Sequence, residues 1–343
     1  MGCDDRGTYK ETETQTPGVE TIDVGGYPNG IAVNETYMFV VLGAEHAGPD
    51  SLPEATGVES VVQVFNLDGT FVTEIVVDGG GHSMLATQDG DVLVAHFSAE
   101  NSISVIDTDL LMVRTELGGN PPGNISLPDA LSLSADGQYA YVGSNGLDGS
   151  GWLARIILEE DTVDENWKSS VAGGATSWVE ADDIGLYLYA NSWTGGTTQR
   201  KDAVTGADAG SLEVGEFPHS ITFNQDQSFG YVAVTGGNDL VKIRLLDFTK
   251  EGSIPGPWDG LWGDPSNAVL SAEGNFLFVA NHDMGYVAVL DINPASATYD
   301  TVVEIIQVGA DPIFQTLTKD GDILFISNNG DGSISRVDVS QYR

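Results

Sequence analysis

The sequence predicts an all-β fold, a seven-bladed β-propeller closed by its own N-terminal strand. Three observations predict it. A short segment recurs seven times along the 343 residues, each copy is followed by the same order of strands and turns, and the last copy is one strand short. No helical pattern of useful length interrupts the repeats. The chain is therefore expected to form one large repeat domain rather than two average ones.

The recurring segment begins at a Gly, Pro or Ala and continues as an alternating strand. Its seven copies are PNGIAV from Pro28, GHSMLAT from Gly81, PDALSLS from Pro128, ATSWVEA from Ala175, PHSITF from Pro218, PSNAVLS from Pro265 and PIFQTLT from Pro312. Successive copies start 53, 47, 47, 43, 47 and 47 residues apart. This period is typical of one four-stranded propeller blade, about 40–50 residues in the commonest families.

Each copy is followed by a hairpin turn and two further strands. Asp-Gly or a similar pair makes the turn, and it is a strong hairpin signal because both residues accept a positive φ. Examples are Asp89-Gly90, Asp136-Gly137, Glu273-Gly274 and Asp320-Gly321. The second strand is aromatic and β-branched, as at 139–142, 276–279 and 323–326, and the third reads like 102–107, 286–291 and 333–338. A fourth strand ends in Val-Gly or Leu-Gly and leads into the next repeat.

The two ends of the chain together predict how the ring closes. The last repeat stops after its third strand, while the segment 19–25 (VETIDVG) matches the fourth strand at 303–309. We therefore expect 19–25 to complete the final blade, which removes the open sheet edges that an unclosed array would expose. The predicted organisation is a flexible N-terminal tether at 1–18, polar throughout, followed by a single propeller domain at 19–343.

The repeats resemble those of the YVTN-repeat propellers of bacteria and archaea. The resemblance rests on Phe278-Val279-Ala280-Asn281 followed by a third strand that ends in Asp291, and it covers residues 19–343. Blade four departs from the pattern, and blade one has a long insert from Ala44 to Glu59. The resemblance implies the seven-bladed fold. It leaves function open, since relatives include surface-layer and exported proteins, lactonase-like enzymes, and propellers that bind haem d1 or copper.

The charge of the chain excludes two classes of partner. The sequence has 51 Asp and Glu against 13 Lys and Arg, a formal net charge of −38. Such a surface repels phosphate backbones and anionic lipid, so neither nucleic acid nor polybasic docking to a membrane is expected. Two interpretations remain. One is a halophilic protein, soluble in high salt through hydrated carboxylates whose repulsion is screened. The other is an acidic surface that collects cations.

The single cysteine bears on localisation. Cys3 excludes an internal disulfide framework. Gly2-Cys3 followed by Asp4 and Asp5 resembles the start of a mature bacterial lipoprotein, in which Met1 would replace a removed signal peptide. This interpretation predicts an extracytoplasmic protein, in the periplasm or at the cell surface, anchored through a lipid on Cys3. The alternative is a plain cytosolic N-terminus. No apolar run is long enough to span a membrane.

The histidines indicate a candidate metal site. In a propeller, the loop entering the first strand of a blade and the loop joining its second and third strands lie on one face, around the central channel. All five histidines (His46, His82, His96, His219 and His282) are expected in loops of that face. Neutral imidazole binds Cu, Zn or Fe, so His82, His96, His219 and His282 are the candidate metal ligands. The alternative is that they are ordinary polar loop residues, because no short pattern such as HExxH occurs.

Other side chains of the same face are candidates for ligand binding. The polar ones are Asn29, Asp129 and Asn267, with further groups at Asn145, Asn191, Asp239, Asp283, Asp311 and Asn328. Trp178 and Trp193 either stack on a flat ligand or pack between blades, and the insert 255–262, with Trp258 and Trp262, is expected to be exposed. The loops 328–333 and 148–150 have the oxygen ligands that Ca prefers, or are simply hairpin turns.

Two function classes stay open from the sequence. The first is a non-enzymatic, exported propeller that binds a protein, a small molecule or a metal at its channel mouth. The second is a propeller enzyme of lactonase-like hydrolytic type, which would need polar groups or a metal in the channel mouth to activate water. The sequence has no GxSxG elbow, P-loop or dinucleotide fingerprint. We expect the first class.

Overall fold

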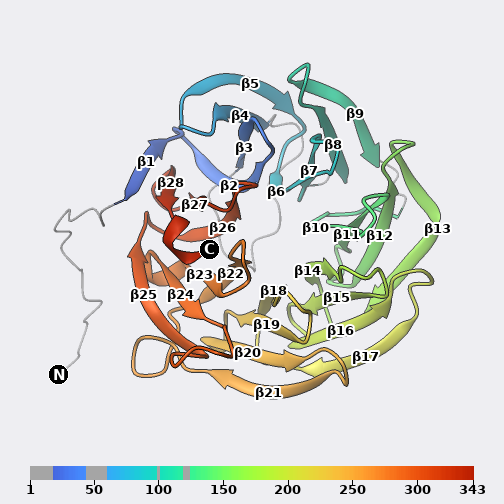
Figure 1. Cartoon of the computed structure of the whole chain (residues 1–343). Coiled ribbons are helices and arrows are strands. Elements are labelled where there is room, and N and C mark those ends of the chain that lie inside the picture. Colours follow the sequence, from blue (N-terminus) through green and yellow to red (C-terminus); the bar gives the residue numbers. More distant parts are fainter. Residues whose placement is uncertain (1–17, 44–59, 99–100, 119–123) are drawn as a thin grey trace, which may run out of the picture.

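The computed structural model describes residues 18–43, 60–98, 101–118 and 124–343. Cys3, most of the predicted tether and the insert 44–59 with His46 lie outside these residues. The described strands form seven four-stranded antiparallel sheets, arranged as the blades of a closed ring (Figure 1). The predicted fold class is therefore confirmed. None of the described residues forms a helix long and apolar enough to cross a membrane.

The blades follow one another along the chain, and in each the first strand lies innermost. Blade one contains β2 (Tyr27–Val33), β3 (Tyr37–Gly43), β4 (Ser60–Asn66) and β5 (Phe71–Val77). Blade two contains β6 (Gly81–Ala86), β7 (Val92–His96), β8 (Ser102–Asp107) and β9 (Met112–Gly118). Blade three contains β10 (Ala130–Leu133), β11 (Tyr139–Asn145), β12 (Gly151–Ile157) and β13 (Thr162–Val171). Blade four contains β14 (Thr176–Ala181), β15 (Tyr187–Ser192), β16 (Thr197–Asp202) and β17 (Asp208–Glu213).

The remaining blades repeat this order. Blade five contains β18 (Pro218–Phe223), β19 (Phe229–Val234), β20 (Asp239–Arg244) and β21 (Thr249–Ile254). Blade six contains β22 (Pro265–Leu270), β23 (Phe276–Asn281), β24 (Tyr286–Asp291) and β25 (Thr301–Gln307), with the short 3₁₀ helix η1 (His282–Met284) after β23. Blade seven contains β26 (Pro312–Leu317), β27 (Ile323–Asn328) and β28 (Ser333–Asp338), and the 3₁₀ helix η2 (Ser340–Tyr342) follows it.

The fourth strand of blade seven comes from the other end of the chain. β1 (Val19–Asp23) pairs antiparallel with β28, from Val19 opposite Val337 to Asp23 opposite Ser333. Figure 1 shows this seam as the blue N-terminal strand beside the red C-terminal blade. The backbone N–H of Val24 extends the ladder by donating to the carbonyl of Gly332 at 3.1 Å. The predicted closure of the ring is therefore confirmed.

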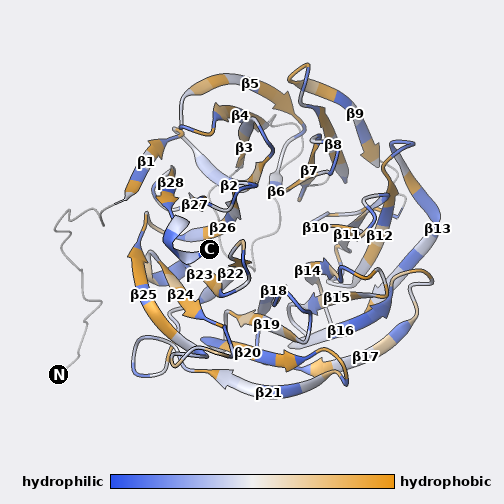
Figure 2. Cartoon of the chain, in the orientation of Figure 1, coloured by the Kyte–Doolittle hydropathy of each residue, from blue (hydrophilic) through white to orange (hydrophobic). Residues whose placement is uncertain are grey.

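Apolar side chains hold neighbouring blades together. Each of the seven boundaries between blades has its own buried cluster. At the seam, Ile31 and Met38 of blade one pack with Ile313 and Phe325 of blade seven. The outer strands also contribute to these clusters; in β9, Val113 packs toward blade one and Leu117 toward blade three. Figure 2 shows both apolar and polar residues along this outer strand, and exposed residues alternate there with less exposed ones.

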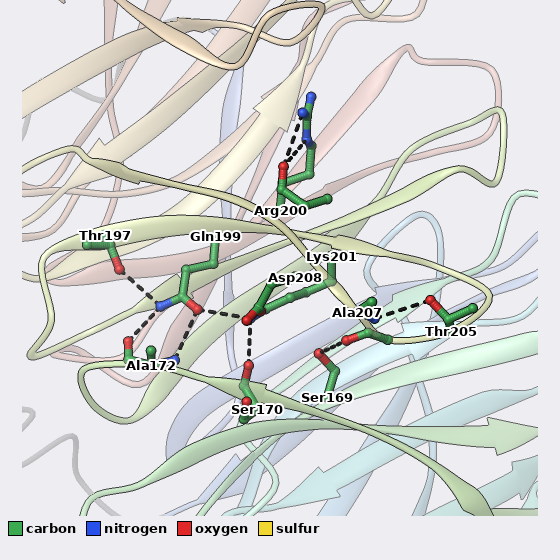
Figure 3. A network of polar contacts seen from close by, with 12 residues as sticks. Ser169, Ser170, Ala172, Thr197, Gln199, Arg200, Lys201, Thr205, Ala207 and Asp208 are labelled. Atoms are coloured by element: carbon green, nitrogen blue, oxygen red, sulfur yellow. Dashed lines mark hydrogen bonds and ion pairs between the residues drawn. The ribbon is translucent and has the colours of Figure 1, made fainter.

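Buried polar contacts also join the blades. Between blades three and four, the ammonium group of Lys201 is almost fully buried and donates to the carbonyl of Ser170 at 2.6 Å and to Oε1 of Gln199 at 3.0 Å (Figure 3). It is also paired with Asp208. The amide of Gln199 in turn donates to the carbonyl of Ala172 at 2.6 Å. These partners satisfy the lysine, so its burial has a structural explanation.

The direction of the inner strands gives the channel two different ends. β2, β6, β10, β14, β18, β22 and β26 surround the centre of the ring (Figure 1). We call the end where these strands begin the histidine end, since His82 and His219 lie there. We call the opposite end, formed by the hairpin turns between first and second strands, the turn end.

Candidate functional site

His82 and Asp129 form an ion pair at the histidine end. His82 lies at the start of β6 and Asp129 just before β10, in equivalent places of neighbouring blades. Nδ1 of His82 is 3.0 Å from Oδ1 of Asp129, and both side chains are partly exposed. Burial by itself would lower the pKa of His82, but the charge and hydrogen bonds of Asp129 outweigh it and raise that pKa. Asp129 therefore favours the protonated form of His82.

His219 occupies the corresponding place in β18, and its electrostatics are the opposite. Burial lowers the pKa of His219 to about 4, so the imidazole is neutral at physiological pH. The rings of Trp193 and Trp178 lie 5.9 Å and 6.0 Å from it, centre to centre. Trp193 also packs against Phe217 at 5.2 Å. The histidine end thus combines one chargeable and one neutral imidazole with a set of aromatic rings.

Phe314 and Trp178 form a partition across the channel. The two rings stack at 6.2 Å with an interplanar angle of 22°. Phe314 also meets the ring of His82 at 5.6 Å and that of His219 at 6.2 Å. These four side chains come from four different inner strands, β6, β14, β18 and β26. They separate the histidine end from a cavity in the rest of the channel.

His96 lies away from this group. It ends β7 and is fully buried, and its Nε2 is 2.6 Å from the hydroxyl of Ser104 in β8. That hydroxyl donates to Glu116 in β9 at 2.7 Å, so the imidazole is directed outward within its own blade. Burial lowers the pKa of His96 to about 4 and raises that of Glu116 to about 7. His96 was expected in the loop after the second strand, but it is the last residue of that strand, and its side chain does not face the channel mouth.

His282 belongs to a cluster that has the donors of a metal site. In η1 and the loop before β22, Asp264, His282 and Asp283 each offer one ligand atom, and these atoms lie within 4.8 Å of one another. The backbone brings the loops together, because the N–H of His282 donates to the carbonyl of Asp264 at 3.0 Å. Burial, followed by the charge of Asp283, raises the pKa of Asp264 to about 6. Imidazole and carboxylate together suit Zn, Mn or Fe, so the donor set fits a divalent metal.

The structure therefore separates the four predicted metal ligands. Within the described residues, Asp264, His282 and Asp283 form the one group of three ligand-type side chains close enough to share an ion. His82 and His219 lie in the first strands rather than in the loops before them. Asp283 was among the candidates predicted from the sequence, but Asp264 was not. The place of Asp264 directly before Pro265, at the entry to blade six, was the sequence signal that could have identified it.

The predicted ligand-binding residues also fall into different settings. Asn29 is buried and joins blades, since its amide donates to the carbonyl of Gly81 at 3.1 Å and its Oδ1 accepts from Asn329 at 2.7 Å. Trp193 and Asp129 lie at the histidine end and are partly exposed. Trp178 and Asn267 line the channel cavity instead.

Two expectations about loops have clear outcomes. In the insert 255–262, Trp258 is 46% exposed as expected, but Trp262 is fully buried and donates to the carbonyl of Ile254 at 2.7 Å. The expectation of an exposed Trp262 was wrong because β21 and β24 enclose its ring. In the loops proposed for Ca, Asp148 and Asp331 accept hydrogen bonds from Ser150 and Ser333 of their own turns. These contacts favour hairpin chemistry at both loops.

Beyond the partition lies a cavity of about 750 Å³ that no sequence pattern indicated. It is lined by the later halves of all seven inner strands and by turn residues such as Asp183 and Gln225. Glu180 of β14 lines it next to Trp178, whose Nε1–H donates to Oε2 of Glu180 at 3.2 Å. Burial raises the pKa of Glu180 to about 8, with a further contribution from Asp183. Although its own surface is only partly buried, protein encloses this carboxyl on several sides.

Comparison with known proteins supports the fold and leaves the activity open. No family model matches the chain, and no curated protein matches it in sequence. In structure it is similar to hydrazine synthase of Kuenenia stuttgartiensis, with a TM-score of 0.74, 16% identity, and 97% of this chain and 99% of that chain covered. It is also similar to virginiamycin B lyase from Staphylococcus aureus, with a TM-score of 0.70, 15% identity, and 94% and 99% covered. At such identities the likeness concerns the propeller fold alone.

Proposed function

We propose that this chain is a YVTN-type propeller that acts as a binding protein through the histidine end of its channel. The observation that supports this is the gathering there of groups suited to recognition. Partly exposed His82 and Asp129 lie next to the aromatic rings around His219, in loops and strand starts of several blades. Binding sites are commonly concave, mostly apolar and provided with a few polar groups. A protein or small-molecule ligand at this mouth is the partner that this composition fits.

A divalent transition metal is part of this proposal. Asp264 and His282 approach through the blade-entry and second-to-third-strand loops of blade six, which belong to the histidine end. His282 is near enough to His219 to contribute to lowering the pKa of that residue. With two carboxylates and one imidazole, the cluster would hold the metal and leave further coordination positions for a ligand.

Zinc titration of the full chain tests the metal. Protein purified without an affinity tag and dialysed against a chelator is titrated with Zn²⁺ in a calorimeter. We expect one Zn²⁺ per chain and at least tenfold weaker binding in His282→Ala. Asp148→Asn, in the corresponding loop of blade three, is the matched control and should bind as the wild type does. No uptake by the wild type, or equal uptake by both variants, would reject the site.

The second candidate is a hydrolytic enzyme of lactonase-like type. The same donor set favours it, because three protein ligands are typical of catalytic zinc, which lowers the pKa of bound water. An indicator assay for acid release from γ-butyrolactone, with and without Zn²⁺, separates the two candidates. Turnover that requires Zn²⁺ and is lost in His282→Ala would favour the enzyme over the binding protein.

We also propose that the protein works outside the cytoplasm, at high salt, and anchored through a lipid on Cys3. The support is compositional: the Gly2-Cys3 start, the polar stretch after it and the net charge of −38. Mass spectrometry of the protein from its native source tests the anchor. A Cys3 bearing diacylglyceryl and acyl mass is expected, and an unmodified thiol would contradict it.

A further inference from the structure

The cavity at the turn end is a second site, separate from the histidine end. Its volume of about 750 Å³ lies in the range of small-molecule pockets, roughly 300–1,000 Å³. Trp178 and Phe314 belong to its lining, and residues from the hairpin turns of blades three, four and five line it toward the turn end. Because these two rings stand between the cavity and the two histidines, a ligand here would contact Trp178 from the other side but not His82, His219 or His282.

All the charged side chains that line the cavity are negative. Of its residues, Glu180, Asp182 and Asp183 are acidic, and none is Lys, Arg or His. Asp182 is used by its own turn, where its two oxygens accept from the N–H groups of Leu186 at 2.7 Å and Tyr187 at 3.0 Å. Glu180 accepts from Trp178 and has no cationic neighbour among the lining residues. A carboxylate that protein encloses on several sides is costly to ionise without a cation beside it, so this site favours a cationic ligand.

Carboxylates of the hairpin turns at this end add to the negative charge of the lining. Each of the seven first hairpin turns contributes an acidic residue: Glu35, Asp89, Asp136, Asp183, Asp226, Glu273 and Asp320. The same turns contain a single cationic side chain, Lys319, which pairs with Glu35. Several of these carboxylates also accept hydrogen bonds within their turns, as Asp136 does from Ser134 at 2.7 Å. Their contribution is therefore a negative potential at the entrance, which raises the local concentration of cations.

The aromatic wall narrows the class of cation. A positive charge over the face of Trp or Phe is attracted by the ring quadrupole, and alkylated ammonium groups gain most because they are weakly hydrated. Trp178 places such a ring beside the carboxyl of Glu180, and Phe314 extends the apolar surface. We propose that the channel cavity binds a small organic cation of the alkylated ammonium type, held by Trp178 and Glu180.

Binding should be linked to a proton. The titratable groups facing the cavity are Glu180, Asp182 and Asp183 of blade four, while β10 and β18 on either side present Ser132, Ser134, Thr222 and Asn224. With a pKa of about 8, Glu180 is protonated in the empty cavity at neutral pH. A cation that pairs with its carboxylate displaces this proton. Affinity should therefore rise about tenfold per pH unit up to pH 8 and level off above it.

Calorimetry with choline tests the proposal on the full chain. Choline is titrated at pH 6.5, 7.5 and 8.5, and its uncharged isostere 3,3-dimethyl-1-butanol and Ca²⁺ are titrated in parallel. We expect choline to bind more tightly as the pH rises, and the isostere to bind at least tenfold more weakly. Equal binding of choline and the isostere would overturn the assignment, as would Ca²⁺ binding without choline binding or the absence of any binding.

Two variants locate the site. Glu180→Gln mimics the protonated carboxyl and should lose at least tenfold in choline affinity together with its pH dependence. Glu273→Gln removes one charge from the mouth on another blade and should change affinity less than threefold. Circular dichroism checks that both fold. Unchanged choline binding in folded Glu180→Gln would place the cation elsewhere and reject the proposal.

Discussion

The two ends of the channel are built from the same seven strands and yet differ in chemistry. At the histidine end, His82 and His219 lie at strand starts, Asp129 lies just before one, and aromatic rings pack against the two histidines. At the turn end, the same strands enclose a cavity whose charged groups are all carboxylates. The stacked rings of Phe314 and Trp178 stand between them. The difference teaches that single substitutions at equivalent positions, rather than the fold, give each end its chemical character.

Glu180 shows how one position sets the chemistry of an end. Its partner across the hairpin is Tyr189, as Tyr141 is for Ser132 and Tyr231 is for Thr222. The corresponding residues of the seven inner strands are Ala32, Leu85, Ser132, Glu180, Thr222, Val269 and Thr316. Blade four alone places a charge there. The other six residues leave the rest of the wall apolar or weakly polar.

Opening the ring should destabilise the whole propeller and with it both ends of the channel. This is the largest effect that we expect. Deleting residues 1–26 removes β1 and the buried side chains of Val19 and Val24, which costs roughly 3–6 kcal/mol from the two valines alone. It also exposes the edge of β28. Thermal unfolding followed by circular dichroism should show a large loss of stability. Deleting residues 1–16 is the control and should leave the melting temperature unchanged; equal effects of the two deletions would contradict the seam.

Removing the partition should merge the two ends. Phe314→Ala deletes a buried ring that touches three aromatic side chains, at a cost of about 3 kcal/mol. Acrylamide quenching should then reach Trp178 more easily. Phe71→Ala, on an outer strand with a ring that is 52% exposed, should cost less than about 1 kcal/mol. Similar losses in both variants would mean that Phe314 does not close the channel.

The stability of the folded chain should depend on pH through the carboxyl of Glu180 at the turn end. The pKa of Glu180 is about 8 in the folded chain and 4.5 as an ordinary value, so stability is fully present below pH 4.5 and is lost as the pH rises toward 8. The loss should be on the order of 2 kcal/mol, less than the full shift because water in the cavity solvates the carboxylate. Chemical denaturation at pH 5 and pH 9 measures it. Glu180→Gln should lack this loss of stability at high pH. If the stabilities of the variant and the wild type changed with pH in parallel, the raised pKa of Glu180 would be refuted.

The histidine end should respond to pH over a different range. Asp129 raises the pKa of His82, so the stability from this pair is complete below pH 6.5 and is lost as the pH rises through the raised value. Asp129→Asn should cost about 1 kcal/mol at pH 6 and little at pH 9. Proton NMR should show the pKa of His82 falling in the variant, while His219 stays uncharged between pH 5 and pH 9. An unchanged His82 titration would contradict the pair.

The sequence could predict the fold because the propeller repeats its signals. The repeat period and the hairpin turns recur along the chain, and 19–25 supplies the strand that the last repeat lacks. Counting strands was therefore enough to locate the seam. The site depended on single side chains instead. His96 was predicted in a loop but belongs to the end of β7, where the pleat and the contact with Ser104 set the direction of its ring. Glu180 was missed because the repeat of blade four was taken to begin at Ala175, whereas in the strand pairing Thr176 occupies the place that Pro218 has in blade five. The assumed register was therefore wrong by one residue and placed Glu180 at an apolar position.

A crossed titration tests most directly whether the two ends bind separate ligands. Wild type, His282→Ala and Glu180→Gln are each titrated with Zn²⁺ and with choline at pH 8.5. The structure predicts that His282→Ala loses Zn²⁺ and keeps choline, and that Glu180→Gln loses choline and keeps Zn²⁺. Loss of both ligands in one folded variant, or of neither in both variants, would contradict the separation of the two ends.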